Sequence, residues 1–224
     1  MKTDSKTILS PFALCDRYYE NVRKRIFTLL FIGYARVRKM NQDLTQADED
    51  DITNRIVKEI EVYQKDINSP DWADSYMVEQ QRPIAPSGEI GDKRKWLDIF
   101  LRGNRAEGNH EFCFESKRLY PDQKTERYFG QQGMQRFLTG LYPVNLQKEA
   151  GMLGYVQSHD IPYWLNWLRK HFADSRNDLC VPAEANWNDY SVVEELENTF
   201  QTCHKPEGEN IVLFHILLSF TNAQ

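Results

Sequence analysis

The residues best suited to chemistry are two carboxylates and a lysine, which lie in two apolar segments joined by a polar connector. Asp98 interrupts the segment WLDIFLRG, and Glu115 and Lys117 interrupt the segment HEFCFESKRL. The connector NRAEGN is rich in residues that favour turns, so the pattern predicts a β-hairpin. Because side chains alternate along a strand, Glu115 and Lys117 share one face, and antiparallel pairing allows Asp98 to lie beside Glu115.

Two carboxylates and an amine that meet at one point favour the chemistry of a hard divalent cation. Mg²⁺ and Mn²⁺ prefer oxygen ligands. A lysine next to such a metal can orient or deprotonate a water molecule, or offset the charge of a phosphate. In the alternative interpretation, Asp98 is simply a cross-strand partner of Lys117 on a solvent-facing strand. The metal interpretation is favoured because residues 96–101 are apolar on both faces of the expected strand, where a carboxylate is costly unless it is paired or bound to a metal.

This D-…-E-x-K arrangement resembles the PD-(D/E)xK nuclease superfamily, which has the restriction-endonuclease-like fold. The segments ESKRL, ERYFGQQGMQRFLTG and EAGMLGYV also resemble a group of bacterial proteins with that core, and the resemblance covers roughly residues 50–220. Leu97 stands where the family pattern often has proline. The resemblance implies that Asp98, Glu115 and the backbone carbonyl of Ser116 bind Mg²⁺ or Mn²⁺, and that Lys117 activates or positions the attacking water.

The resemblance also implies a glutamate from the helix that opens the fold. Residues 51–67 predict such a helix, because Ile52, Ile56 and Ile60 fall on one apolar stripe at 100° per residue. Glu59 lies at the edge of this stripe and is the candidate. The alternative, a border glutamate with its carboxylate in water, stays open.

Charge is unevenly distributed along the chain, whose net charge is −5. Residues 41–92 contain thirteen Asp/Glu and four Lys/Arg, whereas residues 93–136 contain six Asp/Glu and ten Lys/Arg. Basic side chains around the motif are therefore expected to contact the phosphates of a nucleic acid, the alternative being a solvated surface. The candidates for this substrate-binding role are Arg82, Arg118, Lys124, Arg127 and Arg136.

Arg127 and Arg136 differ in the position that a helix would give them. Residues 125–142 predict a helix, and two residues nine apart fall on opposite sides of it. They cannot both face the site unless Gly130 and Gly133 distort the helix. Arg127 is the favoured contact because it is nearer the motif.

The expected order of elements indicates an α/β fold. Helices are expected at 11–40 (one long helix or two broken near Gly33), 51–67, 125–142 and 162–172, with a short one within 191–202. Strands are expected in the hairpin, at 151–158 and 211–220, and briefly at 75–79. This order fits a restriction-endonuclease-like mixed central sheet flanked by helices. Residues 1–45 are expected to form an N-terminal helical extension and residues 46–224 the nuclease-like domain.

Several classes of protein are disfavoured. The longest apolar run, IVLFHILLSF, is too short for a membrane span, and the N-terminus lacks the pattern of a signal peptide. Four scattered cysteines without a CxxC pair predict a reduced, cytoplasmic protein. No histidine lies in a metal-binding motif, and His215 is expected to be a hydrogen-bonded core residue. Phosphate-loop and dinucleotide-binding motifs are not found.

The function expected from these features is that of a Mg²⁺- or Mn²⁺-dependent endonuclease. It would hydrolyse phosphodiester bonds of nucleic acid, with DNA as the expected substrate. Family analogy favours bacterial antiviral defence or restriction. A partner protein or a homo-oligomer would help an acidic protein to hold this substrate. The alternative is a catalytically silent nuclease-like domain that serves as a binding or assembly module for a partner protein.

Overall fold

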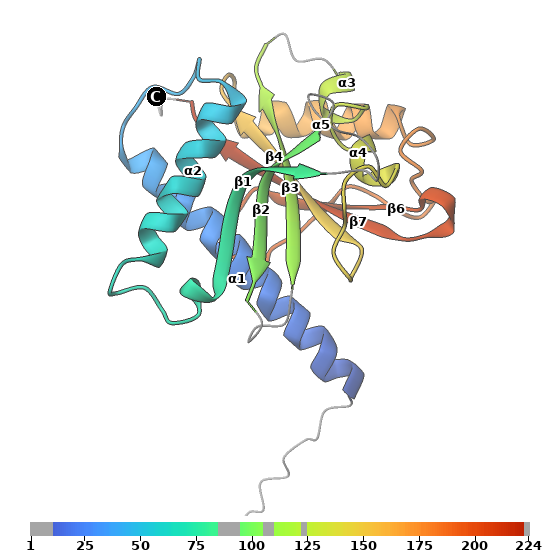
Figure 1. Ribbon diagram of the computed structural model, residues 1–224. Coiled ribbons are helices and arrows are strands. Elements are labelled where there is room, and N and C mark those ends of the chain that lie inside the picture. Colours follow the sequence, from blue (N-terminus) through green and yellow to red (C-terminus); the bar gives the residue numbers. More distant parts are fainter. Residues whose placement is uncertain (1–10, 85–94, 105–109, 122–124, 222–224) are drawn as a thin grey trace, which may run out of the picture.

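The protein is an α/β structure built on one mixed sheet of seven strands. A computed structural model describes residues 11–84, 95–104, 110–121 and 125–221. The strand order is β1-β2-β3-β4-β7-β6-β5, with a parallel centre, β3-β4-β7, between antiparallel edges (Figure 1). The strands are β1 (Tyr76–Ile84), β2 (Lys95–Gly103), β3 (Glu111–Leu119), β4 (Glu149–Val156), β5 (Asn188–Asp189), β6 (Thr199–His204) and β7 (Ile211–Ser219). The predicted hairpin is thus β2 and β3, and the prediction of a mixed sheet flanked by helices is confirmed at this level.

Helices cover both faces of the sheet and create two hydrophobic cores. The helices are α1 (Pro11–Lys39), α2 (Glu49–Gln64), α3 (Thr125–Tyr128), α4 (Gln135–Leu138) and α5 (Ile161–Asp174). Side chains of α1 and α2 pack with Phe112 and Phe214 from the sheet. Side chains of α3, α4 and α5 pack with Met152 and Leu213 on the other face. Within the described part of the chain, no helix is long and apolar enough to cross a membrane.

Helix α1 belongs to the core of the sheet. It is one continuous helix of 29 residues, without a break at Gly33. Phe27 and Leu30 are fully buried in the same core as the strands. Gly33 is the point of closest approach to α2, since a Cβ there would lie 2.6 Å from the carbonyl oxygen of Ile56. The segment predicted as an N-terminal extension therefore shares its packing with the sheet.

Two helices expected from the sequence do not form as predicted. Residues 125–142 form two single turns, α3 and α4, because the chain turns sharply at Gly133, where a Cβ would lie 2.1 Å from the carbonyl oxygen of Tyr128. The short helix expected within 191–202 is wrong. Residues 199–204 instead form β6 beside β7, and from Phe200 to His204 their burial alternates with the period of a strand.

The sheet opens between β2 and β3 close to the motif. Residue pairing between these strands runs from Arg102–Glu111 to Ile99–Phe114 and stops there. β3 continues alone on β4, paired as far as Leu119 and Val156. On β1, Gln81 has a φ of 49° between the pairs that flank it, which marks a kink at the same level. The motif residues therefore lie where β2 separates from β3.

Candidate functional site

Asp98, Glu115 and Lys117 come together at this opening in the sheet. The Nζ atom of Lys117 lies 2.8 Å from Oε1 of Glu115. Oδ2 of Asp98 accepts hydrogen bonds from the backbone N–H of Ser116 (2.6 Å) and from its hydroxyl (2.8 Å). The Asp98 carboxylate is near enough to both partners to affect their pKa values. The structure thus brings together the three residues that the motif predicted.

Glu115 is the most constrained member of this cluster. Its exposed fraction is 1%, and Oε1 accepts hydrogen bonds from Lys117 and from Arg136 Nη1 (2.7 Å). Oε2 is buried and has no hydrogen-bond partner in the part of the chain that the structure describes. Burial, followed by the charge of Asp98, raises the pKa of Glu115 to about 8 despite the two cations. A buried carboxylate oxygen without a partner is costly, and a bound cation would relieve that cost.

Lys117 holds its proton firmly. Burial opposes its charge, but the carboxylates of Glu115, Glu49 and Asp98 outweigh burial and raise the pKa of Lys117 to about 12. Its Nζ also donates to Glu49 Oε1 at 2.9 Å and to the carbonyl of Ser116 at 2.5 Å. In this state Lys117 acts as a cation and hydrogen-bond donor. The Ser116 carbonyl, predicted as a metal ligand, is engaged by this ammonium.

The glutamate that reaches the cluster from a helix is Glu49, which the sequence analysis did not select. Glu49 is the first residue of α2, and its Oε2 accepts a hydrogen bond from the backbone N–H of Arg118 at 3.1 Å. Burial raises its pKa, and Lys117 opposes that rise. The signal available in the sequence is the acidic run DEDD at residues 48–51, where the helix starts.

Glu59, the predicted helix glutamate, lies elsewhere. Its Oε2 accepts a hydrogen bond from Nε of Arg36 on α1 at 2.8 Å. The stripe that predicted its position faces α1 and the sheet core, so a residue at the middle of α2 is directed toward α1. The N-terminal part of α2 reaches the strand ends where the cluster lies.

The two arginines after the motif have exchanged the places expected for them. Arg136, on α4, contacts Glu115 and the hydroxyl of Tyr142, and that hydroxyl donates to the carbonyl of Trp96 at 2.6 Å. Arg127 is exposed on α3 and donates to the hydroxyl of Tyr120 at 2.6 Å. The distortion at the glycines brings Arg136 into the cluster, whereas Arg127 stays at the surface of α3. The preference for Arg127 as the residue that contacts substrate stays a prediction.

The other predicted basic residues have different neighbours. Arg118 donates to Oε1 of Gln157 at 2.6 Å and lies 4.8 Å from the ring centroid of Tyr120. Arg82 lies 3.9 Å from the ring centroid of Phe100, on β2. Lys124 lies outside the described residues. Arg118 and Arg127 also line an open depression together with Glu49, so the cluster borders a surface that a ligand can approach.

The donor atoms of the cluster suit a magnesium-type ion. Among the residues that the structure describes, no group of three or more His, Cys, Asp or Glu is arranged to hold a metal. Mg²⁺, however, is usually bound through one or two carboxylates and retains several waters. Asp98 and the buried Oε2 of Glu115 would supply two such carboxylates, and their negative charge would balance that of a cation.

Comparisons of this chain with protein-family models, curated proteins and solved structures found no match.

Proposed function

We propose that the protein is a Mg²⁺- or Mn²⁺-dependent nuclease with a restriction-endonuclease-like core, acting on nucleic acid and above all on DNA. The observation that carries this proposal is Glu115: a buried carboxylate with one unpartnered oxygen, beside Asp98 and Lys117. The order of β2, β3, a helical segment and β4 supports the same superfamily.

Each residue of the cluster has a role in phosphodiester hydrolysis under this proposal. Asp98 and Glu115 would hold the metal ion, which would supply polarisation of the phosphate and a lowered pKa for a water molecule. Lys117 keeps its proton, so it orients the attacking water and offsets the negative charge that develops on the phosphate. Glu49 holds the Lys117 ammonium in place through their contact at 2.9 Å.

A second candidate is the catalytically silent module. The observation in its favour is that Glu115 Oε1 is already neutralised by Lys117 and Arg136. A buried carboxylate with two cationic partners can be a stable part of a fold without any metal. Under this alternative, the cluster fixes the opening between β2 and β3, and the surface serves a partner protein.

Cleavage assays with a matched pair of glutamate variants separate the two functions. Purified protein is incubated with MgCl₂, MnCl₂ or EDTA and with linear, supercoiled and single-stranded DNA and RNA. Glu115→Gln should abolish metal-dependent cleavage, whereas Glu59→Gln, which lies in an ion pair with Arg36, should not. Equal cleavage by wild type and Glu115→Gln would overturn the nuclease. An absence of both cleavage and Mn²⁺ binding in wild type would favour the module.

A further inference from the structure

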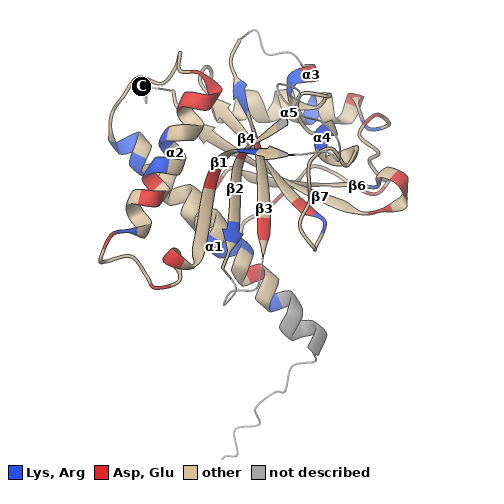
Figure 2. Ribbon diagram, viewed as in Figure 1, with Lys and Arg blue, Asp and Glu red and all other residues tan. Residues whose placement is uncertain are grey.

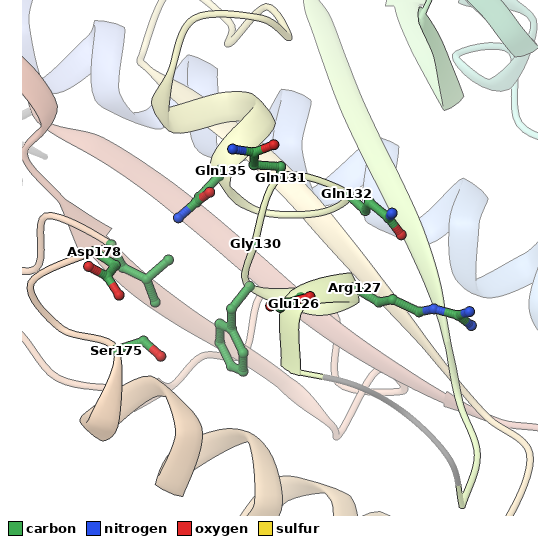
Figure 3. A pocket seen from close by; sticks show the side chains of 10 residues that line it. Glu126, Arg127, Gly130, Gln131, Gln132, Gln135, Ser175 and Asp178 are labelled. Carbon is green, nitrogen blue, oxygen red and sulfur yellow. The ribbon is translucent and has the colours of Figure 1, made fainter.

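A polar hollow lies between the turn that joins α3 to α4 and the C-terminal end of α5. Gln131, Gln132 and Gln135 line one side of it, and Ser175 and Asp178 line the other. Figure 3 shows Gln135 extending toward the side of the hollow that carries Asp178. Three glutamine amides therefore border one concave surface, where each offers both donors and an acceptor.

A basic ridge connects this hollow with the candidate active site. Arg127 lines the hollow and also the open depression, whose lining holds Arg118 and the four acidic residues at 48–51. Arg127 donates to the hydroxyl of Tyr120, and the Arg118 guanidinium lies over the same ring. We name Arg118, Tyr120 and Arg127 the basic ridge. Figure 2 shows Lys and Arg both near the end of β3 and on α3, in agreement with this path.

The chemistry of the hollow differs from that of the ridge. Two carboxylates, Glu126 and Asp178, lie among its lining residues. Carboxylates repel phosphate, but they accept hydrogen bonds from the exocyclic amines of nucleobases, as glutamine amide oxygens do. Phe129 also borders the hollow, but it is almost fully buried. The hollow therefore suits a base edge, whereas the ridge suits the phosphates next to that base.

We propose that the hollow binds one unpaired nucleobase with an exocyclic amine, while the adjoining phosphates cross the basic ridge toward Glu115. This inference rests on the proposed nuclease function and specifies its substrate. A base within a duplex cannot enter a concave site unless it leaves the stack, so the bound nucleic acid has a single-stranded segment beside the cut.

Equilibrium binding tests the hollow without cleavage. Fluorescence anisotropy in EDTA measures the affinity of labelled oligo(dA), oligo(dT) and a duplex, because adenine has an exocyclic amine and thymine has none. Wild type should bind oligo(dA) most tightly. The triple variant Gln131→Ala, Gln132→Ala, Gln135→Ala should lose about tenfold of that affinity, as expected when contacts to a single base are removed. Gln147→Ala, on the chain before β4 and outside the hollow, is the matched control.

A salt series separates the ridge from the hollow. Arg127→Gln should weaken binding of all three oligonucleotides and reduce the log–log salt slope by about one. The triple variant should leave that slope unchanged, because amides release no counterions. This difference identifies base contact as the reason for the loss.

The outcomes distinguish this inference from the nuclease proposal. If wild type cleaves but the triple variant binds oligo(dA) as well as wild type does, the hollow is not a base-binding site, and the proposed nuclease function is unaffected. If binding by the triple variant falls as expected but no metal supports cleavage, base binding by the hollow is supported and the proposed nuclease function is wrong. If wild type binds no oligonucleotide, the proposal that the hollow binds a nucleobase is wrong. Equal affinity for oligo(dA) and oligo(dT) would contradict the preference for a base with an exocyclic amine.

Discussion

Two buried polar groups on the same sheet differ in how completely their atoms are paired. One is the cluster of Asp98, Glu115 and Lys117. The other is a chain of hydrogen bonds between Tyr128, His215, Thr202 and His204, which ends at the carbonyl of Leu179. The consecutive distances along this histidine chain are 3.1, 2.8, 2.7 and 2.7 Å.

The histidine chain is satisfied with both imidazoles neutral. His204 Nδ1 must donate, because its partner is the Leu179 carbonyl, so its Nε2 accepts from Thr202. The Thr202 oxygen then accepts from His215 Nε2, and His215 Nδ1 accepts from the Tyr128 hydroxyl. Burial lowers the pKa of His204 to about 4 and lowers that of His215 well below its usual value. The prediction that His215 is a hydrogen-bonded core residue is confirmed.

The cluster leaves a carboxylate oxygen without a partner and holds several charges close together. Complete pairing is typical of a group that serves the fold, whereas a buried carboxylate with one oxygen left unpartnered is typical of a functional site. The comparison teaches that pairing, more than burial, separates the two roles.

The largest expected effect is on the chemistry of the cluster. Asp98→Asn should reduce metal-dependent cleavage on the order of 10³-fold, because a metal ligand loses its charge. His204→Gln, in the histidine chain, should leave cleavage by the folded protein unchanged. Initial rates with MgCl₂ and MnCl₂ give the measurement. A similar loss in both variants would remove the distinction between the two regions.

A large effect on stability is expected from breaking the histidine chain. Thr202→Val removes the hydroxyl between the two imidazoles and leaves a donor and an acceptor buried without partners. The free energy of unfolding should fall by about 3 kcal/mol. Urea denaturation measures it, with Thr139→Val as the control, since Thr139 is exposed and bonds only within its own helical turn. If Thr202→Val lowers the free energy of unfolding no more than the control does, the histidine chain does not stabilise the fold.

The two regions should respond to pH with opposite signs. The pKa values of His204 and His215 are lower in the folded protein, so protons bind the unfolded chain preferentially and stability falls as pH drops below about 6.5. The pKa of Glu115 is raised to about 8 in the folded protein. Protonated Glu115 therefore stabilises the fold below about pH 4.5, and this stabilisation is lost as pH rises through 8.

Urea denaturation between pH 5 and pH 9 tests these signs, without metal. Glu115→Gln should flatten the decline in the free energy of unfolding on the alkaline side, because glutamine does not titrate. His204→Gln should flatten the acidic side. If Glu115→Gln shows the same decline in stability at alkaline pH as wild type, Glu115 stays ionised in the folded protein.

The smallest effect is expected from Glu49, which touches Lys117 but not the unpaired oxygen of Glu115. Glu49→Gln should lower cleavage by about tenfold, as is usual when the partner of a site residue is removed. Its matched control on the same helix is Glu59→Gln, with no loss expected. A larger loss than that of Asp98→Asn would make Glu49 a primary metal ligand.

The sequence by itself determined the hairpin and the three residues on it. Asp98, Glu115 and Lys117 are joined by a short connector, and strand alternation decides which side chains share a face. This geometry is local, so it can be derived without knowledge of the rest of the chain. The buried His215 was predictable for a similar reason, because its strand is apolar on both sides.

Only the tertiary structure decided which helical glutamate and which arginine complete the cluster. The crossing of α1 and α2 at Gly33 sets the position of α2, so Glu49 reaches Lys117 while Glu59 pairs with Arg36. The turn through Gly133 brings Arg136 to Glu115. Helical periodicity gives the angle of a residue around an axis, but it does not give the position of that axis over the sheet, because distant packing contacts determine it.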